Sequence, residues 1–265
     1  MNIVFIGAGR LATQFAKALY AKGHTISAVF SRTMESASAL TSMVGGFPTD
    51  TIAALPLDAD AYILAVKDSV LPALITQLKE GREERPMYHT AGSVPMTVFE
   101  GVHHHGVIYP MQTFSKERDV DFAHLPIFIE ANDDESLKVA TELAISVSDN
   151  VRQLSSEERR HLHLAAVFAC NFSNHCYTLA ADILERYGVP FDVLLPLIDE
   201  TTQKAHTLHP RDAQTGPAVR YDENVIAAQL QLLVDKPLMQ QVYDVMSRSI
   251  HESSIIPTPH ISLND

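Results

Sequence analysis

The first strand-and-turn segment of the chain constrains its fold more than any other feature. Residues 2–6 form a short apolar run with β-branched side chains, and Gly7-Ala8-Gly9-Arg10-Leu11-Ala12 follows with the spacing G-x-G-x-x-A. The first glycine permits a tight turn, the second lets a pyrophosphate approach the backbone, and the alanine keeps the next helix close to the sheet. That helix, expected over residues 11–22, would present free N–H groups to phosphates. The segment predicts a dinucleotide-binding unit; the alternative is an ordinary strand-to-helix turn.

The end of the second expected strand indicates which dinucleotide is bound. Residues 25–30 predict this strand, and Ser31-Arg32-Thr33 follows it. Sites selective for NAD usually place Asp or Glu here, to bind the ribose 2′-OH. A cation between two hydroxyls suits a 2′-phosphate instead, so the sequence favours NADP(H). If Arg32 is only a solvated loop residue, an NAD-dependent enzyme remains the alternative.

Strands and helices alternate through the first half of the chain, which predicts an α/β domain with a Rossmann-type, mostly parallel sheet over residues 1–154. Helices are expected at 34–43, 71–80 and 95–99, and from a capping box at Asn132 and Glu135 to Val147. The further strands are a short one after Pro48 and those at 59–66, 86–89, 106–109, 126–130 and 151–154.

The carboxyl ends of the parallel strands predict where the cofactor lies, because open α/β sheets bind ligands beyond that edge. Val66, Lys67 and Asp68 follow one strand and are expected at the cofactor crevice, and Ala91 lies in a small, polar loop, residues 89–93, after another. That loop lines a nicotinamide pocket or is a routine turn. The predicted cofactor-binding residues are Gly7, Gly9, Arg10, Leu11, Ser31, Arg32, Thr33, Val66, Lys67 and Ala91.

After residue 154 the pattern changes to helices alone, which predicts an all-α domain over residues 155–265 for substrate binding and dimerisation. Ser155 and Glu158 form a capping box, and nothing breaks a helix from there to Tyr187. Further helices are expected at 191–207, 224–233 and 238–251, with a ligand-holding or subunit-contacting loop at 209–220 and a loosely held tail from Pro257.

Polar side chains on the long helix are candidates for catalysis. At about 100° per residue, His163 and Asn174 share a face, with Asn171 about 80° from His163. These groups either bond to one another and to backbone or line a substrate cleft. His209 and Thr215, in the following loop, are further candidates.

Composition excludes several other classes of function. The formal net charge of −12 argues against a nucleic-acid surface, and no apolar run is long enough for a membrane span. The two cysteines, Cys170 and Cys176, are spaced to face different sides of one helix, which makes a disulfide or zinc site improbable. Residues 103–105 are consecutive histidines, for which a solvated loop is favoured over a metal site. Without a targeting signal, we expect a cytoplasmic protein.

Segments spread over nearly the whole chain resemble a known superfamily. They are residues 6–12, 30–32, 64–68, 89–93, 109–114, 163–171 and 215–222. The superfamily of NADP-dependent reductases that they resemble includes pyrroline-5-carboxylate reductase, prephenate dehydrogenase, ketopantoate reductase and 6-phosphogluconate dehydrogenase. The chain looks more closely like bacterial oxidoreductases that pair a Rossmann-like domain with a helical C-terminal domain of unknown function. This resemblance implies NADP(H) binding and a homodimer built through the helical domains.

The chain departs from the better-known hydroxyacid dehydrogenases of this superfamily at one position. They carry Lys four residues before an Asn on the long helix, whereas here Val167 precedes Asn171 and Cys170 precedes Asn174. Lysine-based proton transfer is therefore in doubt.

His163 is instead the first candidate for the proton that accompanies hydride transfer between NADP(H) and a small keto acid or cyclic imine, because imidazole titrates near neutral pH. Asn171 would orient the substrate, with His209, Asp212 and Thr215 as secondary candidates. The alternative is an NADP(H)-binding sensor or scaffold without turnover.

Overall fold

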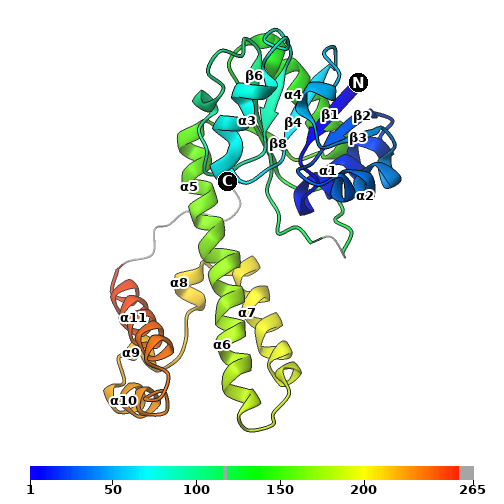
Figure 1. Ribbon diagram of the computed structural model, residues 1–265. Coiled ribbons are helices and arrows are strands. Elements are labelled where there is room, and N and C mark those ends of the chain that lie inside the picture. Colours follow the sequence, from blue (N-terminus) through cyan, green and yellow to red (C-terminus); the bar gives the residue numbers. More distant parts are fainter. Residues whose placement is uncertain (116–117, 257–265) are drawn as a thin grey trace. The chain divides into compact units, whose positions relative to one another are not determined.

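The computed structural model describes residues 1–115 and 118–256, which form two compact units, one ending at Asn171 and the other beginning at Phe172 (Figure 1). The first unit contains β1 (Asn2–Ile6), α1 (Arg10–Ala21), β2 (Thr25–Phe30), α2 (Met34–Val44), β3 (Phe47–Thr49), η1 (Ile52–Ala54), β4 (Ala61–Leu64), η2 (Asp68–Val70), α3 (Leu71–Leu78), β5 (Met87–His89), η3 (Met96–Val98), β6 (His105–Pro110), β7 (Ile127–Ala131), α4 (Asp134–Val147), β8 (Val151–Gln153) and α5 (Ser156–Ala166). A π-helical stretch, η4 (Val167–Phe172), crosses the boundary.

All eight strands of the described chain belong to one sheet, in the order β3-β2-β1-β4-β5-β6-β7-β8. Every neighbouring pair is parallel except β6 and β7, where Tyr109 lies opposite Phe128. The chain runs outward from β1 through β2 to β3 and then crosses to β4 on the other side of β1. The prediction of a Rossmann-type, mostly parallel sheet is confirmed, and its topological switch point lies between β1 and β4.

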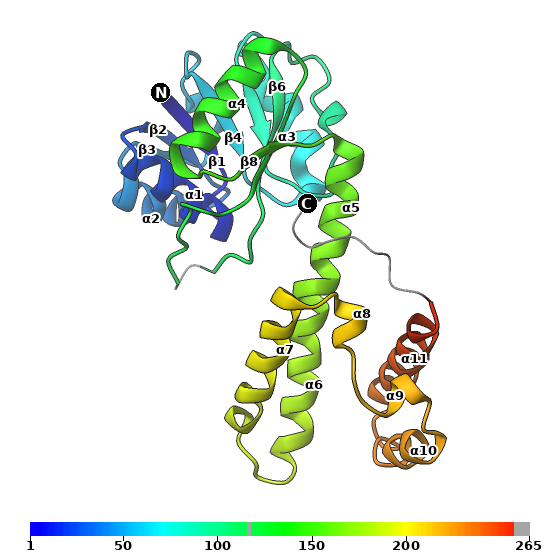
Figure 2. The ribbon, with the colours of Figure 1, turned by 180° about the vertical axis from the view of Figure 1, so that it is seen from behind.

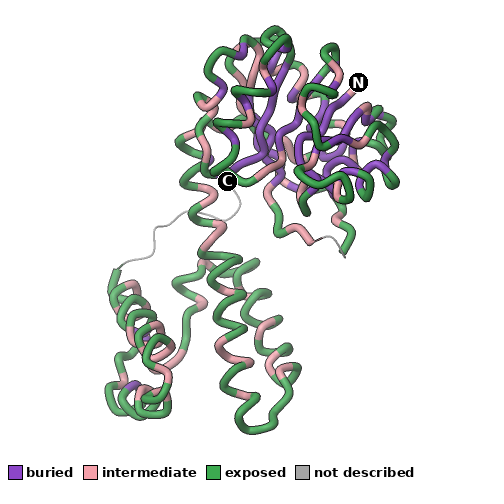
Figure 3. Tube along the Cα trace, in the orientation of Figure 1, coloured by how far each residue is buried: buried purple, intermediate pink, exposed green. Residues whose placement is uncertain are grey.

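The sheet is covered on both faces, which explains why β1 is apolar throughout rather than alternating. Ile3 and Phe5 pack with α1, α2 and α4, which lies across the sheet in Figure 2. Val4 and Ile6 point to the opposite face and pack with α3. The buried residues of the first unit therefore follow its strands (Figure 3).

Two local predictions in this unit are wrong. The N-cap of α4 is Asp133, whose side chain accepts the Ser136 N–H, and not Asn132, whose Oδ1 accepts the His105 N–H at 2.8 Å instead. The expected helix near Pro95 is only the single 3₁₀ turn η3. The first difference comes from the contact of Asn132 with β6, which a capping pattern does not contain.

The long helix begins as predicted, because Ser155 and Glu158 form the expected capping box. It is not uniform, however, since η4 separates α5 from α6 (Ser173–Glu185). A π-helix turns less per residue than an α-helix, so the arithmetic that placed His163 and Asn174 on one face fails across this stretch. Strands cease after residue 153, but the first compact unit continues to Asn171 because α5 packs against the sheet.

The second unit is helical throughout its described residues. It contains α6, η5 (Phe191–Leu194), α7 (Leu195–Thr207), α8 (Pro210–Ala213), α9 (Pro217–Arg220), α10 (Glu223–Gln231) and α11 (Pro237–Ser254). The expected loop at 209–220 therefore holds two short helices, each begun by a proline at its first position. The expected tail from Pro257 lies outside the described residues. None of the helices described here has the length and apolar character to cross a membrane.

Candidate active site

The turn after β1 lies against the turn after β4, at the switch point of the sheet. Gly7 has φ +114°, and its N–H donates to the Phe30 carbonyl at 2.8 Å. A Cβ on Gly7 would lie 2.3 Å from the Ala65 carbonyl oxygen. Glycine is required here both by the backbone angle and by the neighbouring strand end.

The second glycine of the motif is required by neither constraint. Gly9 has φ −78°, and a Cβ there would meet nothing within 4 Å. It is the N-cap of α1, makes no side-chain capping bond, and no acidic residue follows in the first turn. Arg10 is exposed and Leu11 half-buried, whereas Ala12 is fully buried against the sheet. The open N-terminus of α1 is thus a site suited to phosphate.

The segment after β2 presents polar groups at the same edge of the sheet. Ser31 is held through its N–H, which donates to the Thr49 carbonyl at 3.0 Å. Thr33 is the N-cap residue of α2, and its hydroxyl donates to Ser36 at 2.9 Å. Arg32 is exposed and forms no ion pair within the described part of the chain. Its guanidinium is available to a phosphate.

The remaining predicted cofactor residues follow β4 and β5. Val66 touches the Gly7 turn, since its Cγ1 would lie 3.1 Å from a Cβ on Gly7. Lys67 is exposed and precedes η2. Ala91 is buried, and its N–H donates to Nδ1 of His89 at 3.1 Å.

The clearest catalytic geometry in the first unit is a pair formed by Tyr109 and His163. The Tyr109 hydroxyl, at the end of β6, lies 3.0 Å from Nδ1 of His163 on α5. The two rings meet edge to face, with centroids 6.1 Å apart. The imidazole also touches the loop after β5, because a Cβ on Gly92 would lie 2.5 Å from the same Nδ1.

The Tyr109 hydroxyl can serve either tautomer of His163, because a phenol oxygen both donates and accepts hydrogen bonds. Burial raises the pKa of Tyr109, an effect that the Arg159 charge opposes and the Asp68 and Cys170 charges reinforce. The phenol therefore stays protonated. Its hydrogen bond occupies Nδ1 of His163, whereas Nε2 has no hydrogen-bond partner among the described residues.

A carboxylate lies next to the same loop. The Ser93 hydroxyl donates a short hydrogen bond to Oδ2 of Asp68, which follows β4. Both side chains are exposed in the first unit. Ser93 directly follows Gly92, so one loop joins the Asp68 carboxylate to the His163 imidazole.

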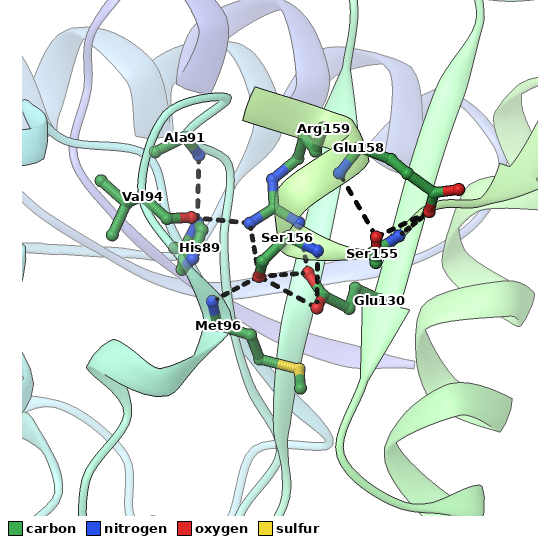
Figure 4. A network of polar contacts seen from close by, with 9 residues as sticks. All are labelled: His89, Ala91, Val94, Met96, Glu130, Ser155, Ser156, Glu158 and Arg159. Atoms are coloured by element: carbon green, nitrogen blue, oxygen red, sulfur yellow. Dashed lines mark hydrogen bonds and ion pairs between the residues drawn. The ribbon is translucent and has the colours of Figure 1, made fainter. Parts of the chain in front are cut away.

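A buried polar network attaches α5 to the loop after β5 (Figure 4). Arg159 pairs with Glu130 of β7 and donates to the Val94 carbonyl at 2.6 Å. The Ser156 hydroxyl accepts the Met96 N–H at 2.9 Å and donates to Glu130. His163 lies one helical turn beyond Arg159, so this network sets the position of the imidazole.

His89 supports the loop from beneath. Its side chain is fully buried and stacks on Phe99, with ring centroids 5.6 Å apart. Burial, reinforced by the Arg159 charge, lowers the pKa of His89 to about 3. The ring is therefore neutral, and its Nδ1 accepts the Ala91 N–H at the start of the loop.

The predicted catalytic residues are not all in this unit. Asn171 is exposed in η4, at the end of the first unit. His209 and Thr215 belong to the second unit, where Nδ1 of His209 caps α8 by accepting the Arg211 N–H and Thr215 is exposed. Within the first unit, His163 has a polar partner at the strand ends, the Tyr109 hydroxyl.

Sequence reasoning missed Tyr109 as a candidate. It placed Asp68 at the cofactor crevice and Gly92 and Ser93 in the loop that lines a nicotinamide pocket or is a routine turn, without giving any of them a catalytic role. Tyr109 stands at the carboxyl end of an expected strand, a signal that was already used for Val66, Lys67 and Asp68. The contact of Gly92 with His163 had no such signal, because 71 positions separate the two residues in the chain.

Two known families match separate parts of the chain. The family described as NADP oxidoreductase, coenzyme F420-dependent, matches residues 2–87, and a domain of unknown function, DUF2520, matches residues 125–250. No curated protein sequence matches the chain.

A solved structure from Bacteroides fragilis, assigned as an NADP oxidoreductase, is 55% identical, covers 95% of this chain and 98% of its own, and superposes with a TM-score of 0.91. The chain belongs to this NADP oxidoreductase family. This chain joins the two matched domains, and the predicted resemblance to oxidoreductases with a helical C-terminal domain of unknown function is confirmed.

More distant structures share the fold of this NADP oxidoreductase. A Thermotoga maritima protein is 21% identical with a TM-score of 0.69, covering 95% of this chain and 98% of its own. An imine reductase from Myxococcus stipitatus, solved with NADP⁺, is 16% identical with a TM-score of 0.70, covering 96% of this chain and 94% of its own.

Proposed function

We propose that the protein binds NADPH and reduces a small C=O or C=N substrate, with His163 delivering the proton. The observation that carries this proposal is the Tyr109–His163 hydrogen bond, which occupies Nδ1 and holds the imidazole at the carboxyl ends of the strands with Nε2 unbonded among the described residues. Membership of an NADP oxidoreductase family supports the cofactor.

The residues of the first unit fit this cofactor. The open N-terminus of α1, bounded by Gly7 and Gly9, would hold the pyrophosphate, with Arg10 and Leu11 beside it. Exposed Arg32, between Ser31 and Thr33, would bind the 2′-phosphate. The remaining residues that we assign to the cofactor are Val66, Lys67 and Ala91.

The protein's chemical task is to manage one proton. Bound NADPH supplies a hydride to the substrate carbon and becomes NADP⁺, so the substrate oxygen or nitrogen must gain a proton. The imidazolium of His163 would give this proton from Nε2 and remain as the neutral imidazole, whose Nδ1–H donates to the Tyr109 oxygen. Asn171 would orient the substrate, and His209 and Thr215 would contribute from the helical unit.

Cofactor binding is tested by titrating nicotinamide fluorescence with NADPH and NADH, for the wild type and Arg32→Ala. We expect NADPH to bind more tightly by about 1–3 kcal/mol, and the variant to lose most of this preference because the charge-assisted contact is gone. Lys17→Ala, which removes an exposed cation paired with Asp119, is the matched control and keeps the preference. Weak binding of both dinucleotides would contradict the proposal.

Turnover is tested separately, by following NADPH consumption with keto acids, ketones and cyclic imines. We expect His163→Gln to bind NADPH normally but to reduce kcat by about 100-fold or more, as for other general acids. Binding without consumption of NADPH by any of these substrates would favour the sensor or scaffold alternative.

We also propose that the helical unit forms a homodimer. It exposes large apolar side chains that a solvated surface would not need, among them Tyr187 at 75%, Leu232 at 73% and Leu238 at 73%. Light scattering should give twice the 29.2 kDa chain mass, and Leu232→Asp together with Leu238→Asp should give the monomer. A monomeric wild-type protein would contradict the proposed homodimer.

The proposed location is the cytoplasm. The apolar N-terminal run forms β1 in the middle of the sheet, between β2 and β4, rather than a segment apart from the fold. Fractionation of cells that express the protein should recover it in the cytoplasmic fraction.

A further inference from the structure

One exposed carboxylate stands beside the Tyr109–His163 pair, and its position bears on the substrate. Oδ2 of Asp68 is held by the Ser93 hydroxyl. Ser93 follows Gly92, which touches the His163 ring. The carboxylate is therefore connected to the imidazole through two consecutive residues. Its charge also reaches the phenol of the pair, where it adds to the burial that raises the pKa of Tyr109.

The cations of this region are engaged elsewhere or assigned to the cofactor. Arg159 is buried, pairs with Glu130 and donates to the Val94 carbonyl. Lys67 is exposed beside Asp68, where we assign it to the cofactor phosphates. The charge left next to the proton-carrying pair is that of Asp68.

A carboxylate at this point distinguishes C=N from C=O substrates. A carbonyl oxygen gains negative charge as its carbon accepts a hydride, and a nearby carboxylate opposes that charge. An imine nitrogen takes up a proton first and becomes a cation, which the same carboxylate stabilises. A keto acid would in addition bring its own carboxylate against Asp68.

We infer that Asp68 is a specificity-determining residue that selects imines, reduced as protonated iminium cations, over ketones and keto acids. This inference rests on the proposed function and names the substrate class of the same site. The imine nitrogen takes the Nε2 proton of the His163 imidazolium, which becomes the neutral imidazole. The carbon then accepts the hydride pair of NADPH, and the C=N π pair becomes the nitrogen lone pair. The products are NADP⁺ and an amine, which gains a further proton from water.

The first test measures binding without turnover. Isothermal calorimetry compares pyrrolidine, the cationic product of a cyclic imine, with cyclopentanol, the neutral product of a ketone, each added to protein with NADP⁺. We expect pyrrolidine to bind more tightly, and Asp68→Asn to weaken it about 10-fold while leaving cyclopentanol unchanged. Asp58→Asn, an exposed carboxylate before β4 rather than after it, is the matched control and changes neither.

The second test compares kcat/KM for 1-pyrroline and cyclopentanone at saturating NADPH. A preference for 1-pyrroline that falls about 10-fold in Asp68→Asn, but not in Asp58→Asn, supports the inference. Equal use of both substrates, or an Asp68→Asn variant with unchanged pyrrolidine binding, overturns the inference and leaves the proposed reductase standing. If none of the carbonyl or imine substrates leads to consumption of NADPH, the proposed function is overturned, and the inference with it.

Discussion

The hydroxyl of Tyr109 lies 3.0 Å from Nδ1 of His163, although 54 positions separate the two residues in the chain. β6 brings the phenol to the edge of the sheet. α5, which follows β7 and α4 in the chain, brings the imidazole to the same place. The pair thus exists only in the folded first unit.

Removing the phenol hydroxyl should affect catalysis through the imidazole. In Tyr109→Phe, Nδ1 of His163 loses its hydrogen bond and the ring is no longer held in place, so we expect kcat to fall about 5-fold, the worth of one neutral hydrogen bond, with KM nearly unchanged. Tyr62→Phe is the matched control, because the Tyr62 hydroxyl donates to the Pro56 carbonyl, away from the pair. Steady-state kinetics of both variants check this, and equal losses of kcat would contradict it.

A side chain at position 92 should displace the imidazole. The Cβ of Gly92→Ala would lie 2.5 Å from Nδ1 of His163, which costs about 1–3 kcal/mol of unfolding free energy. Urea denaturation measures this cost, and in a His163→Ala background it should be much smaller, because the ring is gone and only the Cβ of residue 163 remains near position 92. The same cost in both backgrounds would show that His163 is not the obstacle.

The two glycines of the first turn should differ in what they disturb. Gly7→Ala combines a φ of +114° with a contact of 2.3 Å to the Ala65 oxygen, so we expect a loss of about 2–4 kcal/mol of stability. Gly9→Ala has open space around its Cβ and should fold normally, but bind NADPH more weakly. Thermal unfolding and NADPH titration separate these effects; a Gly9→Ala variant with full affinity would contradict the assigned phosphate site.

Removing one partner of the Glu130–Arg159 ion pair should cost more unfolding free energy than replacing both partners with uncharged side chains. The two side chains are 16% and 1% exposed, so Glu130→Gln leaves an unpaired buried cation and should cost about 3 kcal/mol. Glu130→Gln combined with Arg159→Met should cost less than the sum of the two single variants. Urea unfolding of the full cycle checks this coupling, and additive losses would exclude it.

The buried His89 should make the protein less stable in acid. Its pKa is lowered to about 3 in the folded state, against an ordinary value of 6.5, so below pH 6.5 the unfolded chain binds a proton that the folded chain does not. Unfolding free energy should therefore fall by up to about 1.4 kcal/mol per pH unit between these two pKa values.

The contribution of His89 can be separated from that of other histidines. Burial also lowers the pKa values of His24 and His105, so these two residues contribute to the pH dependence of the wild-type unfolding free energy. His89→Gln cannot titrate, and its unfolding free energy should depend less steeply on pH by the His89 contribution. If the unfolding free energies of the wild type and His89→Gln depend on pH with the same slope, the lowered pKa assigned to His89 is contradicted.

The sequence determined the architecture of the first unit because local patterns encode it. Apolar runs covered on both faces, the glycine turn after β1 and the Ser155 capping box each depend on residues close together in the chain. The same signals predicted which strand ends form the edge of the sheet assigned to the cofactor. The need for glycine at position 7 follows from the tight turn after β1, which the sequence itself indicates.

Only the tertiary structure decided the rest of the candidate site. The Tyr109–His163 bond, the Gly92 contact and the Asp68–Ser93 bond join residues from different elements and loops, and contacts between distant segments leave no periodic pattern in a sequence. The π-helical stretch η4 escaped detection for a related reason: its residues favour a helix, and an extra residue in one turn changes no helical propensity. Local chemistry fixes which elements form, whereas packing between them fixes which side chains meet.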